Sequence, residues 1–61
     1  MNTKLLAALQ KERGQAKMYL HASKSVKGNE LTREAWHLLE EKLGILESYV
    51  QILEEQIAQL G

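Results

Sequence analysis

The chain has 61 residues, with no cysteine, no proline and equal numbers of acidic and basic residues. This length allows one domain at most, residues 1–61, and a chain this short buries only about 60% of the surface that its unfolded form exposes. Because disulfides and thiolate zinc sites are excluded, we expect a partner subunit to supply the missing stability. We also expect a cytoplasmic protein without a membrane span, since the composition suits a reducing compartment and no apolar run is long enough.

The zero net charge hides two oppositely charged halves. Residues 1–28 carry six Lys and Arg against one Glu, a net charge of +5, whereas residues 29–61 carry two against seven Glu, a net charge of −5. Such halves attract each other, or the basic half faces an external anion.

The first predicted helix covers residues 4–27 and is capped by Asn2 or Thr3. One side of it collects apolar residues, namely Leu5, Leu6, Leu9, Ala16, Tyr19, Leu20 and Val26. Three polar residues interrupt this stripe: Glu12, Arg13 and Ser23. A glycine inside a helix is costly, so Gly14 is expected to mark a bend or a close helix approach.

The break between the helices falls at the sequence Lys27-Gly28-Asn29-Glu30. Gly28 can adopt the left-handed conformation that ends a helix, which predicts a turn over residues 28–32. Thr32 is the expected N-cap of a second helix over residues 33–60. Two helices of similar length joined by a short turn predict an all-α fold, an antiparallel helical hairpin.

The second predicted helix carries a heptad seam with apolar residues at alternating spacings of three and four. Its members are Trp36, Leu39, Leu43, Leu46, Val50, Leu53, Ile57 and Leu60. Further apolar residues widen the face: Leu38, Ile45, Tyr49 and Ile52. One neighbouring helix cannot cover so broad a face, so we predict that the hairpin dimerises through its second helix into a four-helix bundle or coiled coil, with the eight seam residues as the dimer interface. β-Branched residues at the a positions favour a parallel pair of second helices. The alternative is an antiparallel pair, which the lysines of the first helix would permit by neutralising the glutamates of the second.

The first predicted helix also carries a polar ridge, formed by Gln10, Arg13, Lys17, His21 and Lys24. A row of cations could follow a phosphate backbone, or it could be solvated or dock on the glutamates of the second helix. We predict that a protein or nucleic-acid partner contacts Arg13, Lys17, His21 and Lys24. Met18 and Ala22 form a separate exposed patch on this helix, which is a further candidate for partner binding.

Sequence elements for catalysis or metal binding are weak. Glu34-x-x-His37 has the spacing of a di-iron half-site, but the only acid of the first helix, Glu12, is too far along the hairpin to complete it. No catalytic triad and no glycine-rich phosphate loop is found, and we expect two helices to lack a pocket of several hundred Å³. The sequence therefore predicts no enzyme, no metal, no cofactor and no small-molecule substrate.

These observations favour a small homodimeric regulatory or adaptor protein that acts by protein–protein interaction, for example on a transcription regulator. The alternative is a nucleic-acid-binding dimer that uses the basic ridge of the first helix.

Overall fold

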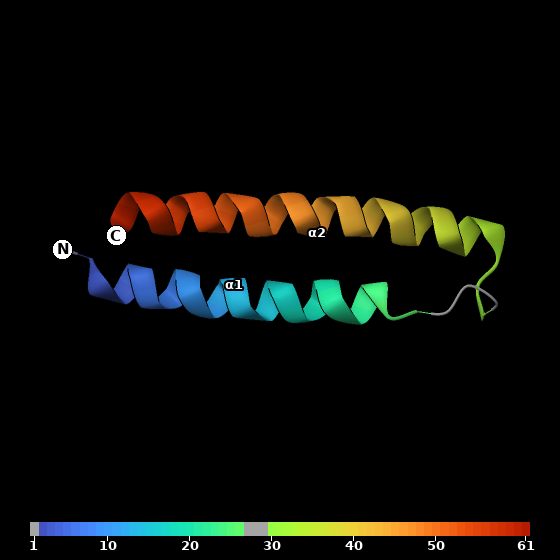
Figure 1. The fold of residues 1–61 in the computed structure, drawn as a ribbon, viewed down its shortest axis with the longest axis horizontal. Coiled ribbons are helices and arrows are strands. Elements are labelled where there is room, and N and C mark those ends of the chain that lie inside the picture. The colour runs from blue at the N-terminus through green and yellow to red at the C-terminus, as the bar shows by residue number, and fades with distance from the viewer. Residues whose placement is uncertain (1, 27–29) are drawn as a thin grey trace.

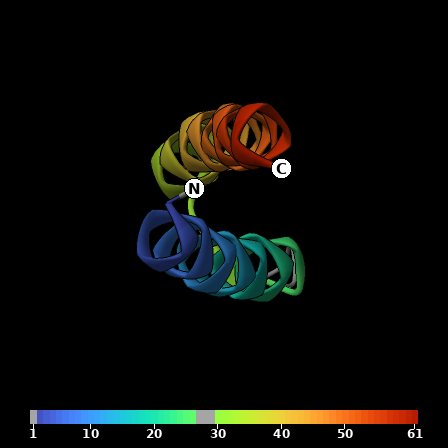
Figure 2. The same ribbon diagram turned by 90° about the vertical axis from the view of Figure 1, so that its left-hand side faces the viewer.

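The computed structural model describes residues 2–26 and 30–61, which form two α-helices packed against each other (Figure 1). Helix α1 spans Thr3–Lys24 and helix α2 spans Arg33–Leu60. The helices run antiparallel, so both chain ends lie at the same end of the rod, and the end view shows that they cross each other (Figure 2). The rod is 48 Å long and 14 by 11 Å across between Cα atoms. The predicted all-helical hairpin is confirmed, and the described residues include no strand.

Both helices begin at the caps that the sequence predicts. The Leu5 amide donates to Asn2 Oδ1 over 3.2 Å, and the Ala35 amide donates to Thr32 Oγ1 over the same distance. Each cap satisfies a backbone donor that has no partner within the first helical turn. Glu34 lies in the first turn of α2, where a negative charge stabilises the positive end of the helix dipole.

Helix α1 ends at Lys24, three residues before the predicted end, whereas α2 has the predicted bounds. Ser25 is the C-cap residue, and its hydroxyl donates to the His21 carbonyl over 2.9 Å. The Ser25 amide also bonds the carbonyls of His21 and Ala22, which tightens the last turn. The predicted role of Gly28 as a helix terminator lies outside the described residues.

The core between the helices is thin. Its buried apolar residues are Leu9, Ala16, Val50 and Leu53, and Ile57 packs against them. Ser23 is also buried, and it follows Ala16 by seven residues, as Ala16 follows Leu9. The inner stripe of α1 therefore becomes narrower toward the turn, because its side chains shrink from leucine to alanine and serine.

A Cβ atom added at Gly14 would meet nothing within 4 Å, so the expected close helix approach at this glycine is wrong. Over residues 2–26 and 30–61, neither helix combines the length and the apolar character needed to cross a membrane.

Candidate interaction surfaces

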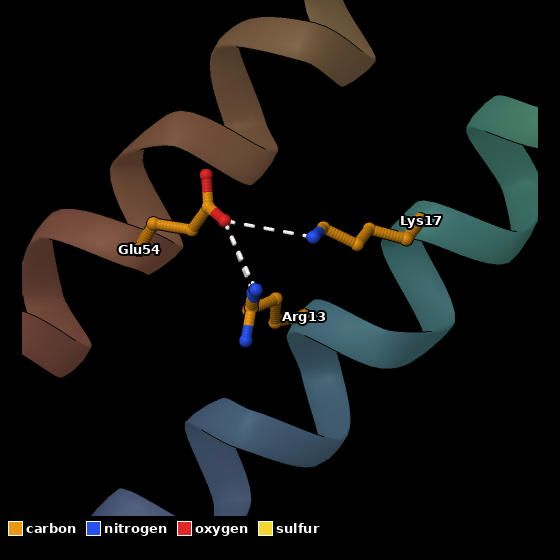
Figure 3. Close-up of polar contacts among 3 residues, drawn as sticks. All are labelled: Arg13, Lys17 and Glu54. Atoms are coloured by element: carbon orange, nitrogen blue, oxygen red, sulfur yellow. Dashed lines mark hydrogen bonds and ion pairs between the residues drawn. The ribbon is translucent and has the colours of Figure 1, made fainter.

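Two edges of the hairpin run along the groove between the helices, and one of them is polar. Glu54 of α2 lies there between two cations of α1 (Figure 3). Glu54 Oε2 accepts from Arg13 Nε at 3.2 Å and lies 3.1 Å from Arg13 Nη2 and 3.6 Å from Lys17 Nζ. The three side chains remain 39–49% exposed, so solvent screens both pairs and each contributes little to stability.

Two of the four residues predicted to contact a partner lie on this polar edge. The structure brings these two, Arg13 and Lys17, onto Glu54, in keeping with the interpretation that the ridge docks on the glutamates of the second helix. His21 and Lys24 are exposed further along α1. Whether any of the four contacts another molecule stays a prediction.

The opposite edge of the hairpin is apolar. A shallow hollow between the helices is lined there by Leu5 and Leu9 from α1 and by Gln56, Gln59 and Leu60 from α2. Tyr19 follows Leu5 by two heptads, and Tyr49 precedes Gln56 by one, so helical spacing places both tyrosines on this edge. Tyr19 is 63% exposed and Tyr49 is 37% exposed.

Most of the large exposed apolar side chains of the described chain share this side of the hairpin. We define the apolar face by the seven that do: Leu5, Tyr19, Leu38, Ile45, Tyr49, Ile52 and Leu60. Leu38, Ile45 and Ile52 are 67%, 69% and 54% exposed and lie seven residues apart, in one row along α2. The remaining one, Met18, is 71% exposed, as the predicted Met18–Ala22 patch requires.

The centre of this row is hollowed. The hollow has a volume of about 490 Å³ and is lined by Glu40, Glu41, Gly44, Ile45, Ser48, Tyr49 and Ile52. The hollow is wide open and comes from one helix, where two small residues, Gly44 and Ser48, adjoin larger apolar ones. It therefore suits a side chain of a packed helix better than an enclosed small ligand. The expected lack of an enclosed ligand pocket stays a prediction.

The eight residues predicted as the dimer interface lie mainly between the two helices of one chain. Val50 and Leu53 are buried there, and five others are half-buried: Trp36, Leu39, Leu43, Leu46 and Ile57. Leu60 is 36% exposed at the end of α2. Their part in a dimer stays a prediction. The surface still open to a second copy lies to one side of this seam, at Leu38, Ile45, Tyr49 and Ile52.

The contribution of α1 to the apolar face was not predicted from the sequence. Leu5 and Tyr19 belong to the predicted apolar stripe of this helix, yet both side chains are exposed. The repeat of Leu9, Ala16 and Ser23 at seven-residue intervals was the available signal for the true inner stripe. Because two of these three residues are alanine and serine, the repeat does not stand out as an apolar stripe in the sequence.

Within residues 2–26 and 30–61, no three His, Cys, Asp or Glu side chains are grouped so that they could hold a metal ion. Comparison with protein-family models, with curated proteins and with solved structures finds no match.

Proposed function

We propose that this protein is a homodimeric helical-hairpin adaptor that acts by binding another protein. The observation that carries the proposal is the apolar face. It leaves Ile45 69% exposed and Leu38 67% exposed, whereas only four apolar side chains are buried among residues 2–26 and 30–61. A second copy would remove this surface from water, and each large aliphatic side chain fully buried contributes about 1.5–3 kcal/mol.

The dimer would present its charged outer surfaces to the other protein. These are the exposed cations of α1 together with the glutamates of α2 that face away from the groove. A regulator of a transcription factor is one protein of this kind. The nucleic-acid alternative has less support, because Glu54 lies between Arg13 and Lys17 and lowers the positive potential of the ridge.

Sedimentation equilibrium from low to high micromolar concentration tests the dimer. We expect a reversible monomer–dimer equilibrium and a melting temperature that rises with concentration. Ile45→Lys places a charge on the apolar face and should weaken association by more than about a hundredfold, because that charge would be buried.

Gln51→Lys is the matched control, since Gln51 is exposed in the middle of α2 three residues before Glu54, on the polar side. It should leave association within about twofold of the unsubstituted chain. A chain that stays monomeric throughout the range, or equal weakening by both substitutions, would refute the homodimer.

The adaptor role needs a second measurement. Affinity capture from the native host, with the unsubstituted chain and Ile45→Lys as parallel baits, should recover a protein that depends on the dimer. Recovery of nucleic acid with both baits would support the alternative instead.

A further inference from the structure

We infer that, in the dimer, α1 of one copy packs on the apolar row of α2 of the other, with the two-fold axis along the length of the hairpins. This inference rests on the proposed function, because it describes how the same homodimer is built. The two copies of α2 are then parallel and diagonally opposed in a four-helix bundle, and every adjacent pair of helices is antiparallel.

The charges of the two helices carry the argument. Helix α1 holds five Lys and Arg against one Glu, a net charge of +4, and α2 holds two against six, a net charge of −4. The structure already has carboxylate and cations meeting across the hairpin at Glu54. The helix that packs on the apolar row of α2 should therefore have an apolar side and a positive net charge. Helix α1 of a second copy has both.

Two hairpins that stack face to face with their helices aligned can form two different symmetric dimers. If the two-fold axis runs along the hairpins, each α1 lies on the partner's α2, and all neighbouring helices have opposite charges. If the axis is perpendicular to the helices, α1 lies on α1 and α2 on α2, so like charges adjoin at both contacts. Like charges at an interface are destabilising, so the first arrangement is favoured.

The register of the hairpin predicts which residues meet. With the axis along the hairpins, the partner's α1 lies at the same height along α2 as the chain's own α1. Arg13 is level with Glu54 within one chain, so Gln15 of one copy comes level with Ile52 of the other. Lys11 likewise comes level with Glu55. Tyr19 comes level with the hollow at Gly44 and Ser48, where its exposed ring has space.

Within one chain these pairs stay apart. The inner contacts belong to the neighbouring residues Ala16 and Leu53, each only 2% exposed, whereas Gln15 is exposed and Ile52 is 54% exposed. A bond between positions 15 and 52 therefore reports a contact between copies. Helix α1 has 22 residues and is about 33 Å long. A contact of about 33 by 14 Å on each copy gives about 900 Å² in total, an area typical of the weaker, reversible interfaces.

Disulfide trapping tests the arrangement directly, because the chain has no cysteine of its own. Gln15→Cys and Ile52→Cys are purified separately, mixed and mildly oxidised, and the products are assigned by mass. We expect the mixed dimer to form predominantly, since Cβ atoms must approach within about 4 Å for a disulfide. Gln51→Cys in place of Ile52→Cys is the control for random collision and should give little mixed product.

A charge exchange provides a test that leaves the apolar face unchanged. Lys11→Glu should weaken association by roughly tenfold, because it replaces an attraction with a repulsion at two symmetric positions. Combining it with Glu55→Lys should restore most of the affinity. Arg33→Glu makes the same change of net charge at the start of α2, beyond the reach of the partner's α1, and should have little effect.

The outcomes separate the arrangement from the dimer itself. A monomer in sedimentation refutes the proposed function and this inference with it. A dimer in which Ile52→Cys forms a disulfide with its own kind would place two copies of α2 side by side, and this inference would be wrong. A dimer with no mixed product and no rescue by Glu55→Lys also rejects it, and leaves the homodimer intact.

Discussion

Truncation of Leu53 tests whether the thin core holds the hairpin together. Leu53 is 2% exposed and is the largest fully buried side chain in the described part of the chain. Leu→Ala changes in cores cost about 2–5 kcal/mol, depending on how far the surroundings relax. Because only two helices surround the site, they can move closer to each other and partly fill the cavity. We therefore expect Leu53→Ala to cost about 2.5 kcal/mol, near the low end of this range.

That loss is large for so small a protein. At about 0.05–0.15 kcal/mol per residue, a chain of this length has a free energy of unfolding of roughly 3–9 kcal/mol. Urea unfolding followed by circular dichroism should therefore show a midpoint about 2.5 M lower for Leu53→Ala, taking a slope near 1 kcal/mol per M.

Ile52→Ala is the control at the neighbouring position, because a single chain buries less than half of the Ile52 side chain, which is 54% exposed. In dilute, monomeric protein it should cost about 1 kcal/mol, less than half the effect at Leu53. Its cost should rise with protein concentration, since the dimer would bury the remainder. A loss below about 1 kcal/mol at Leu53, or equal losses at both positions in dilute protein, would refute this account of the core.

Substitutions at three further positions and a gel shift test other features of the hairpin. Glu54→Gln should cost under about 1 kcal/mol by urea unfolding, and the difference should shrink at high salt because both ion pairs are exposed. Thr32→Ala should cost about 1 kcal/mol through loss of the helix cap, and Thr32→Ser should retain most of that stability. Gly14→Ala should stabilise the protein by about 1 kcal/mol, since nothing obstructs a Cβ atom there. In a gel shift at low salt, we expect no strong nucleic-acid binding; a complex that weakens steeply with salt and is lost in Arg13→Ala would support the alternative function.

The sequence predicted the features of the fold that depend on local chemistry. The caps at Asn2 and Thr32 follow from short side chains with oxygen acceptors, and both make the expected bonds. The bounds of α2 follow from a heptad pattern without exceptions. The end of α1 was less predictable, because neither Ser25 nor Val26, which follow the helix, is a strong helix breaker.

The candidate surfaces were harder to predict, because burial in a two-helix protein depends on the height and rotation of each helix as well as on residue type. Ser23 interrupts the predicted apolar stripe of α1, yet it is buried. Tyr19 is part of that predicted stripe, yet it is 63% exposed. A difference in rotation of a fraction of a turn exchanges the two positions, and the weak stripe of α1 does not specify that rotation.

The mismatch between the two stripes explains why an apolar face remains open. Helix α2 presents large side chains over a broad arc, whereas α1 offers alanine and serine at two of its three buried positions. One narrow helix covers Val50 and Leu53 but leaves the row through Ile45 exposed. Apolar surface attracts any apolar partner without regard to direction, so it cannot by itself choose the helix that covers it. The opposite charges of α1 and α2 can select the covering helix, because they favour contacts between α1 and α2 and oppose contacts between two copies of the same helix.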